Sequence, residues 1–211
     1  MPAPEDPSAV PYRFHAPREV QAGELVLRRW QEDDLEDLFE SVSASLEHLR
    51  PWMPWADGYD LDGAREFLAR QAPRATPDGD EAVSDAGYAM RDPSGRILGS
   101  CGLHGRLGHG ALEIGYWVDV RHTRRGIARL AAALLTETAF ALPGIERVEI
   151  HHDKANVASA GVPASLGFQH DATIVDEPEA PGEVGVEIQW TMAREAFPTS
   201  PAAKLLEDAR R

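Results

Sequence analysis

The sequence has little that would place it in a membrane, a secretory route or a disulfide-stabilised fold. No run of about 18 apolar residues occurs, so no membrane-spanning helix is expected. The first 17 residues contain neither the basic nor the apolar region of a secretory signal. The one cysteine, Cys101, excludes an internal disulfide, and its apolar surroundings favour a buried core residue over a nucleophile. We therefore expect a cytoplasmic protein.

Positive charge is also scarce. The chain has 21 Lys and Arg residues against 35 Asp and Glu residues, which gives a formal net charge of -14. This excess of acid argues against nucleic acid as a partner, because a nucleic acid is itself strongly negative. It suits a cationic partner such as an amine, although a solvated acidic surface explains it as well.

The length and composition indicate one domain. With 211 residues, 43% of them hydrophobic, the chain can bury one sizeable core. Five prolines between residues 2 and 17 predict a flexible or extended N-terminal arm over residues 1–22. We expect the domain at residues 23–194 and a C-terminal tail, with a short helix, at 195–211.

The apolar periodicity predicts an α/β fold, with a mixed sheet and helices on both faces. Helices are expected over residues 33–49, 61–71, from 127 onward, and 157–166, with Asn156 as an N-cap and Gly167 as the end. Strands are expected at 24–30, 87–91, 96–103, 112–118, 147–151, 168–175 and 184–192.

The stretch 112–135 joins an apolar strand to a helix through a basic turn. No acidic residue occurs from Val120 to Thr136, and the turn carries Arg121, His122, Arg124, Arg125 and Arg129. The free N–H groups and positive dipole end of a helix N-terminus suit a phosphate or pyrophosphate. Gly126 has no Cβ to keep such an anion away from the backbone. The alternative is an ordinary connection whose arginines face water.

Residues 123–128, TRRGIA, resemble the acyl-CoA pyrophosphate loop of the GNAT N-acetyltransferases, whose pattern is Arg/Gln-x-x-Gly-x-Gly/Ala. Thr123 departs from this pattern at its first position. The strand sequence EIGYWV before the loop, and residues 156–159 and 166–168 after it, follow in the family's order. Residues 49–55, LRPWMPW, resemble a segment typical of the RimJ/RimL-type protein N-acetyltransferases.

This resemblance implies the GNAT fold, with a mixed, mostly antiparallel central sheet and helices on both faces. It also implies an acyl-CoA-dependent N-acyltransferase, with acetyl-CoA as the acyl donor and direct attack by a primary amine in a ternary complex. The acceptor could be a protein N-terminus, a small-molecule amine or a lysine side chain. The alternative is a catalytically silent acyl-CoA-binding module with a regulatory role. A homodimer is common in the family, and the sequence does not decide it.

The resemblance implies the residues that bind the acyl donor. The pyrophosphate cradle is expected at Arg124, Arg125, Gly126, Ile127 and Ala128, mostly through backbone N–H groups. Backbone groups at the strand end are expected to pair with pantetheine, on Trp117, Val118, Asp119 and Val120. The N–H of Val118 is the candidate oxyanion donor. Asn156 is expected beside pantetheine, where a simple helix N-cap is the alternative, and Ser159 near the leaving sulfur.

Three further side chains are candidates for acceptor chemistry. Glu113 is the one carboxylate inside the central strand and is our candidate general base, acting directly or through a water. The alternative is a strand glutamate paired with an arginine. His104 is a weaker candidate base. Trp52 and Trp55 either pack on the core as a lid or line the acceptor pocket.

Two further sequence features concern a possible metal site and the shape of the helix that carries Ser159. His151, His152 and Asp153 invite a metal site, but neighbouring strand residues point to opposite faces, so we expect no metal. Pro163 would lie inside the helix that begins after Asn156, where it cannot donate a hydrogen bond to the carbonyl of Ser159. A kink is expected there, and it would alter the placement of Ser159.

Overall fold

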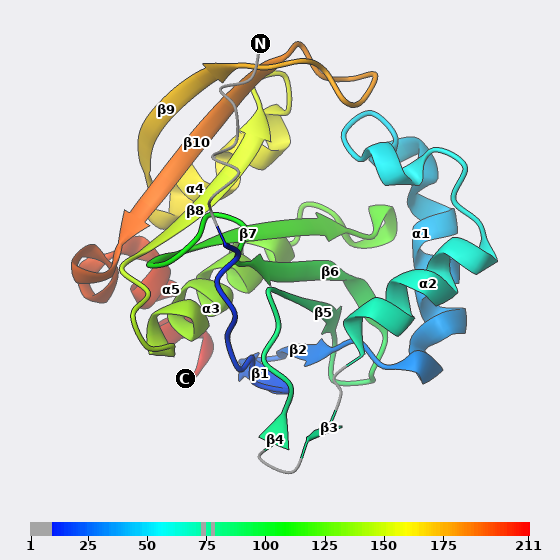
Figure 1. Ribbon diagram of the computed structural model, residues 1–211, viewed down its shortest axis with the longest axis horizontal. Coiled ribbons are helices and arrows are strands. Elements are labelled where there is room, and N and C mark those ends of the chain that lie inside the picture. The colour runs from blue at the N-terminus through cyan, green and yellow to red at the C-terminus, as the bar shows by residue number, and fades with distance from the viewer. Residues whose placement is uncertain (1–9, 73–74, 77–78) are drawn as a thin grey trace.

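The computed structural model describes residues 10–72, 75–76 and 79–211. Its centre is an eight-stranded sheet in the order β1-β2-β5-β6-β7-β8-β10-β9 (Figure 1). Neighbouring strands are antiparallel except β7 and β8, which are parallel. The predicted mixed, mostly antiparallel sheet is therefore confirmed.

The strands of this sheet are β1 (Glu19–Ala22), β2 (Leu25–Arg29), β5 (Asp85–Arg91), β6 (Ile97–His104), β7 (Ala111–Val118), β8 (Arg147–Asp153), β9 (Gln169–Val175) and β10 (Val186–Ala193). A separate hairpin contains β3 (Ala75–Thr76) and β4 (Gly79–Asp80). The helices are α1 (Leu35–Leu49), α2 (Leu61–Gln71), α3 (Ile127–Ala141), α4 (Val157–Leu166) and α5 (Pro201–Ala209). Short 3-10 turns occupy Glu32–Asp34, Pro54–Ala56, Val120–His122 and Arg194–Thr199.

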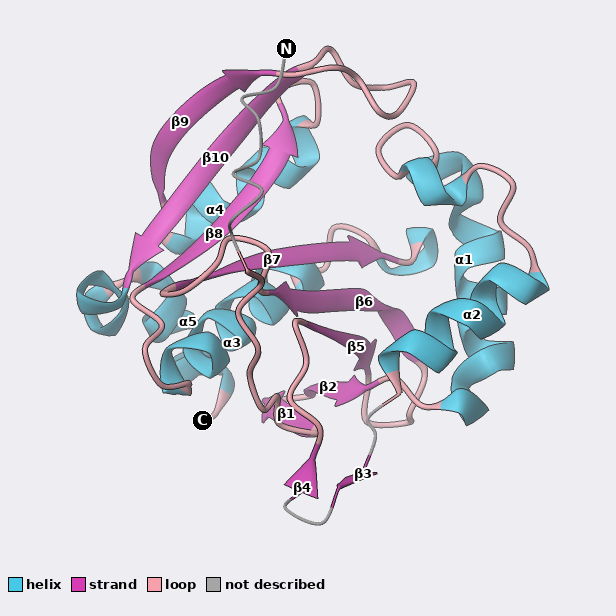
Figure 2. Ribbon diagram, in the orientation of Figure 1, coloured by secondary structure: helices cyan, strands magenta, loops and turns pink. Residues whose placement is uncertain are grey.

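Helices cover both faces of the sheet, as predicted (Figure 2). The core on one face includes Leu134 and Leu135 of α3, together with Cys101 of β6. Cys101 is 3% exposed, which confirms its predicted core position, and burial raises the pKa of its thiol. On the other face, α1 and α2 pack around Trp30. In Figure 1, β8, β9 and β10 lie apart from α1 and α2, so these strands lack helical cover on that side.

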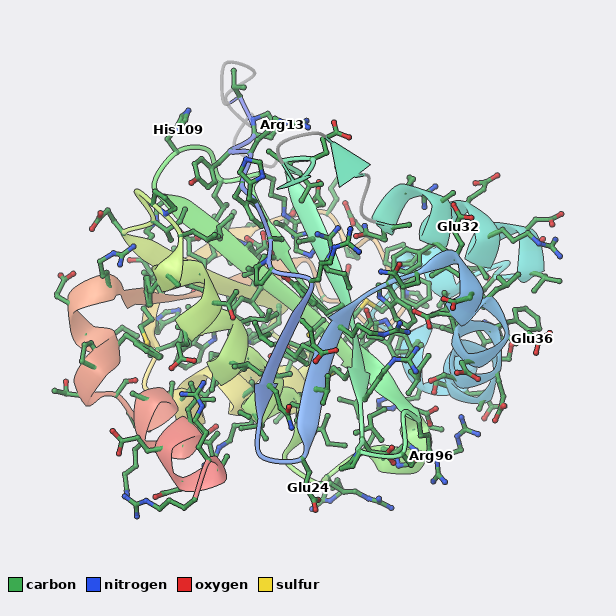
Figure 3. All side chains as sticks on the ribbon, turned by 90° about the horizontal axis from the view of Figure 1, so that it is seen from below. Arg13, Glu24, Glu32, Glu36, Arg96 and His109 are labelled. Carbon is green, nitrogen blue, oxygen red and sulfur yellow. The ribbon has the colours of Figure 1, made fainter. Side chains whose placement is uncertain are left out.

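Local signals account for the confirmed helices. Leu38, Val42 and Leu49 repeat at helical spacing and are buried along α1. Glu32 and Glu36, at the start of this helix, extend away from the sheet (Figure 3). Asp60 caps α2 by accepting a hydrogen bond of 2.8 Å from the N–H of Gly63. Among the described residues, no helix has both the length and the apolar character needed to cross a membrane.

Parts of the expected arm and tail pack on the domain, whereas residues 1–9 of the expected arm lie outside the described residues. Residues 19–22 form β1, which pairs with β2, and Phe14 is 3% exposed and bridges Val83. The proline-free segment after Pro17 can donate the hydrogen bonds that an edge strand needs, which explains why it joins the sheet. At the other end, Ala202 and Leu206 of α5 are buried in the main core. Both ends that the structure describes are therefore packed on the domain.

Candidate active site

The two parallel strands β7 and β8 separate in the middle of the sheet. Their pairing covers only residues 111–113 of β7 and 147–149 of β8, although both strands continue for several residues (Figure 1). The carbonyl and N–H groups of residues 114–118 that face β8 therefore have no strand partner there. This opening has the position that the resemblance implied for the pantetheine.

The N–H of Val118 points into this opening. The next residue, Asp119, donates its N–H to the carbonyl of Leu98 on the β6 side, at 2.9 Å. Because backbone groups of consecutive strand residues point to opposite sides, those of Val118 face away from β6. Gly99 allows this close pairing, since a Cβ there would collide with the carbonyl oxygen of Trp117. By the same alternation the backbone of Trp117 faces β6, which leaves Val118 as the better placed of the two.

The loop after β7 ends in a backbone curl at the start of α3. Arg124 and Gly126 both have positive φ angles, of 61° and 77°. The first helical hydrogen bond runs from the N–H of Leu130 to the carbonyl of Gly126. The N–H groups of residues 127–129 therefore have no acceptor within the helix. Three free donors at a helix N-terminus, beside a glycine, suit a bound anion.

Three arginines at the end of this loop and in the first turn of α3 have no ion-pair partner among the described residues. Arg124, Arg125 and Arg129 are exposed. Across the described residues, no carboxylate lies within 4.0 Å of these three guanidinium groups. We call residues 124–129 the cradle. Its positive charge is available to a bound phosphate, which supports the predicted binding role of Arg124, Arg125, Gly126, Ile127 and Ala128.

A second set of contacts anchors the cradle to α1. Asp119 is fully buried and accepts hydrogen bonds from the Ser41 hydroxyl at 2.7 Å and from the Arg121 backbone N–H at 2.8 Å. Burial would raise the pKa of Asp119, but the hydrogen bonds from Arg121 and Ser41 outweigh it and hold the pKa below its usual value. Arg121 also contacts Glu40 of α1 at 2.7 Å. Arg121 is thus a structural cation, unlike the arginines of the cradle.

Ser45, one helical turn beyond Ser41, completes this anchor. Its hydroxyl accepts the N–H of Val120 at 3.0 Å, and the Val120 carbonyl accepts a hydrogen bond from the Thr123 hydroxyl at 3.2 Å. The backbone of Val120 is therefore engaged within the protein, so its predicted pairing with pantetheine remains a prediction with less support than that of Val118. Ser41 and Ser45 could not be recognised from the sequence, because both look like ordinary small residues on the buried side of a helix.

Asn156 and Ser159 lie together at the start of α4. The side chain of Asn156 accepts the N–H of Ser159 at 3.1 Å, which confirms Asn156 as the N-cap. The Ser159 hydroxyl is 3.2 Å from the hydroxyl of Tyr116, which lies on β7 within the opening. The helix continues through Pro163 to Leu166. Ser159 is thus placed beside the opening, and Tyr116 is a neighbour that the sequence reasoning missed.

Glu113 lies on the side of β7 that carries Trp117, facing the layer of α1 and α2. It is 4% exposed, and both carboxylate oxygens accept hydrogen bonds from Arg106, one of them at 2.6 Å. The arginine-paired alternative therefore describes its resting state. His104, opposite Glu113 on β6, pairs with Asp85 at 2.8 Å. Both candidate bases, Glu113 and His104, are therefore paired in the structure.

His151 extends this polar group across β8. Its imidazole lies 2.8 Å from Glu149, 3.6 Å from Glu187 and 3.8 Å from Glu113. Burial would lower the pKa of His151, but the hydrogen bond to Glu149 and the charges of Glu113 and Glu187 raise it above its usual value. We call Glu113, Glu149, His151 and Glu187, with Arg106 and His104, the open face.

His152 points to the other side of the sheet, as the sequence predicted for adjacent strand residues. The indole N–H of Trp190 donates to its Nε2 atom at 3.0 Å, and its Nδ1 atom contacts the carbonyl of Asp153 at 2.8 Å. The two histidines therefore cannot share one ion. Within the part of the chain that the structure describes, no cluster of three or more His, Cys, Asp or Glu side chains is arranged to hold a metal.

The tryptophans of residues 49–55 differ in position. Trp55 is 44% exposed, and its ring centre lies 6.3 Å from that of Trp117 and 6.0 Å from that of Tyr59. Trp52 is half-buried. The loop that carries them meets the loop between β9 and β10, where the N–H of Gly182 donates to the Pro51 carbonyl at 2.9 Å. This contact joins the loop after α1 to the loop between β9 and β10.

The divided parallel strand pair and the basic helix N-terminus beside it are the features that the resemblance implied for an acyl-CoA-dependent transferase. Residues 24–169 match the family described as Acetyltransferase (GNAT) domain, so the chain belongs to the GNAT family. This confirms the family resemblance, and the protein is an N-acetyltransferase. No curated protein matches the sequence.

Solved structures with this fold include proteins of the predicted type. Mycobacterium smegmatis RimJ, in complex with CoA-disulfide, aligns with a TM-score of 0.72 and 22% identity over 96% of this chain and 97% of that one. Ribosomal-protein-S5-alanine acetyltransferase from Vibrio fischeri aligns with a TM-score of 0.67 and 16% identity, over 85% and 98%. The microcin C7 self-immunity acetyltransferase MccE, in complex with acetyl-CoA and AMP, aligns with 0.68 and 15%, over 81% and 92%. These likenesses establish the fold.

Proposed function

We propose that this protein transfers the acetyl group of acetyl-CoA to a primary amine in the cytoplasm, without a metal. The observation that carries the proposal is the cradle, where three exposed arginines, with no carboxylate partner among the described residues, lie on the segment that holds the free N–H groups of a helix N-terminus. Such a site takes a pyrophosphate. The opening between β7 and β8, which begins after residue 113, lies next to it and suits the pantetheine arm. RimJ and MccE bind CoA or acetyl-CoA on the same fold, which supports this donor.

Residues beside the opening would stabilise the oxyanion and the departing thiolate. Acetyl-CoA supplies an activated acyl group, whose carbonyl carbon forms a bond to the amine nitrogen as the carbon–sulfur bond breaks. The N–H of Val118 would donate to the oxyanion, since it points into the opening. Ser159 would donate a hydrogen bond to the departing thiolate. A thiol has a reference pKa of about 8.5, so its thiolate needs little protonation near neutral pH.

The amine must lose a proton before it attacks. Glu113 would receive it, because it is the carboxylate on β7 nearest to the start of the opening and it lies on the side away from α3. Its oxygens are held by Arg106, whose side chain is 62% exposed. An exposed arginine can move aside or leave room for a bridging water at low cost. His104 is already paired with Asp85 and is the weaker base.

The acceptor would lie between Trp55 and the open face. The exposed ring of Trp55 forms one wall with Trp117, and Trp52 lies on the same loop. Carboxylates on the open face suit a protonated amine before it reacts. Ribosomal-protein-S5-alanine acetyltransferase acts on a protein, as its name states, so a peptide N-terminus is our first choice and a small amine the second. A homodimer remains compatible with this proposal.

One observation favours a second candidate, a catalytically silent module that only binds acyl-CoA. Both oxygens of Glu113 are already held by Arg106, so the structure contains no free base at the opening. Such a module would retain the cradle and lack transfer.

The deciding experiment measures free thiol released from acetyl-CoA in the presence of different amines. The panel contains a peptide with an N-terminal alanine, the same peptide with a blocked N-terminus and an internal lysine, and a polyamine. Amine-dependent thiol release, with the acetylated product found by mass spectrometry, would support the enzyme. Acetyl-CoA binding without release on any amine would support the silent module. Absence of binding would reject both.

A further inference from the structure

Helix α4 contains a proline whose effect reaches Ser159. In a regular helix the N–H of residue 163 would donate to the carbonyl of residue 159, but Pro163 has no N–H. The helix nevertheless continues to Leu166. The half-buried carbonyl of Ser159 thus lacks its helical donor and must be paired by another residue or by water.

Tyr116 supplies that donor. Its hydroxyl lies 3.3 Å from the carbonyl oxygen of Ser159 and 3.2 Å from the Ser159 hydroxyl. One phenolic O–H can donate to the carbonyl, while the phenolic oxygen accepts the single proton of the Ser159 hydroxyl, a bond that the serine gives up when it donates to another acceptor. Burial raises the pKa of Tyr116 to about 12, although its hydrogen bond with Ser159 opposes this, so the phenol keeps its proton at any ordinary assay pH.

The position of Tyr116 connects this contact with the acyl-donor site. Tyr116 lies on β7 beyond residue 113, where β7 and β8 no longer pair, and it packs against the core on the side of α3. The residues before and after it, Gly115 and Trp117, point to the opposite face. Tyr116 therefore links β7, one wall of the opening, to Ser159 at the start of α4.

We propose that Tyr116 is a positioning residue, whose hydroxyl replaces the helical hydrogen bond removed by Pro163 and holds Ser159 at the opening. The structural half of this proposal, a hydroxyl that compensates for a proline, stands on the contacts alone. The functional half, a serine held for the leaving thiolate, rests on the proposed function. Two separate measurements therefore test the two halves.

The first measurement is a double-mutant cycle on thermal unfolding, with Tyr116→Phe, Pro163→Ala and the double variant. Pro163→Ala restores an N–H that can donate to Ser159. We expect Tyr116→Phe to lower the unfolding midpoint by about 2–4 °C in the parent chain, the effect of one hydrogen bond in a chain of this size. In the Pro163→Ala background the loss should be less than half as large. Any cavity left by Pro163→Ala is present both in that variant and in the double variant, so it cancels when the two are compared.

Tyr88→Phe is the matched control. Tyr88 is another buried tyrosine, and its hydroxyl donates to the carbonyl of Pro17 at 3.0 Å, far from α4 in the sequence. Its loss should be equal in the parent and Pro163→Ala backgrounds. Equal losses for Tyr116→Phe in both backgrounds would overturn the compensation by Tyr116, whether or not the protein has activity.

The second measurement is steady-state kinetics with the best acceptor of the panel. Tyr116→Phe should lower kcat about fivefold, the effect of one hydrogen bond, with the KM for acetyl-CoA unchanged. In a Ser159→Ala background, which itself should slow turnover only modestly, Tyr116→Phe should have little further effect. The same fivefold loss in the presence and absence of the serine hydroxyl would show that Tyr116 does not act through Ser159. A parent chain that unfolds as expected but transfers no acetyl group would instead reject the proposed function.

Discussion

The cradle and the open face hold their charges in opposite ways. In the cradle, Arg124, Arg125 and Arg129 are exposed, and none has a carboxylate within ion-pair distance among the described residues. On the open face, by contrast, Glu113 is held by Arg106, and His151 lies among three carboxylates. One region thus presents unbalanced charge, and the other balances its charges internally.

This difference indicates what each region is prepared to meet. Unpaired cations around free N–H groups gain their missing partner only when an anion binds, so the cradle is ready for a ligand as it stands. Buried carboxylates cannot be left unpaired without a large loss of stability, so the open face must compensate itself until a substrate arrives. An acceptor amine must therefore exchange with existing ion pairs, whereas the acyl donor need not.

The largest expected effect comes from reversing the charge of the cradle. In the double variant Arg125→Glu/Gly126→Glu, the stabilisation by acetyl-CoA should disappear. The parent chain, at about 100 times the dissociation constant, should gain about 2.7 kcal/mol, or roughly 5–10 °C in the unfolding midpoint. Gly126 has open space around a new Cβ, although its φ of 77° makes any side chain strained there. The variant should be somewhat less stable but folded, and thermal shift measures both effects.

The turn between β5 and β6 offers a matched control, because it also has an arginine beside a glycine. Gly95 has a φ of 86° with open space around it, and Arg96 projects from the turn (Figure 3). Gly95→Glu/Arg96→Glu changes the net charge by the same amount as the cradle variant and imposes the same kind of backbone strain. This control should keep the full acetyl-CoA shift. If both variants lost it equally, overall charge rather than the cradle would govern binding.

A comparable effect, on turnover rather than on donor binding, should come from Glu113→Gln. Loss of a general base lowers kcat/KM by about 100-fold or more. The acetyl-CoA thermal shift should stay unchanged, because Glu113 lies on the face of β7 away from the cradle. Thiol-release kinetics on the best acceptor test this prediction. The expected loss would show that a carboxylate paired in the resting structure still acts as the general base.

Glu149 is the matched carboxylate for this test. It is opposite Glu113 on β8, is 6% exposed and pairs with Arg147 at 2.6 Å and His151 at 2.8 Å. Glu149→Gln therefore removes an equally buried and equally paired charge without removing the proposed base. A comparable loss of turnover in the two variants would mean that the charge balance of the open face matters and that Glu113 has no special role.

The same contrast explains what could be predicted from the sequence. The cradle is a contiguous segment, and its chemistry depends on backbone N–H groups and on a glycine, so residues 123–128 carry nearly all of the signal. The signals that predicted the helices and hairpins were equally local, since caps and apolar spacing lie within about 15 residues. Even the opposite orientations of His151 and His152 follow from strand geometry alone.

The open face and the supports of the cradle could not be predicted in this way. The partners of Glu113 and His151 come from the loop after β6 and from β8 and β10, and only the tertiary fold brings these segments together. Ser41 and Asp119 are separated by 78 residues, and Tyr116 and Ser159 by 43. Strand β1 was missed because prolines at 2–17 suggested an arm, whereas pairing with β2 depends on the residues after them.

The smallest expected effect is a pH-dependent difference in stability at His151. Its pKa is raised in the folded protein above the usual value of about 6.5, because Glu149, Glu113 and Glu187 outweigh the effect of burial. A raised folded pKa means that the imidazolium stabilises the fold fully below about pH 6.5, and that this contribution is lost as the pH rises through the folded value. We therefore expect His151→Gln to lower the unfolding midpoint more at pH 6 than at pH 9.

The ionisation of Glu149 agrees with a larger effect at pH 6, and the exposed His109 provides the control. Burial would raise the pKa of Glu149, but hydrogen bonds from His151 and Arg147 hold it below its usual value, so Glu149 stays ionised at pH 6. His109 projects from the loop between β6 and β7 (Figure 3), and His109→Gln should have the same small effect at both values of pH. A larger loss for His151→Gln at pH 9 than at pH 6 would mean that His151 is neutral in the fold. The open face would then hold uncompensated negative charge, and an amine would enter it as readily as a phosphate enters the cradle.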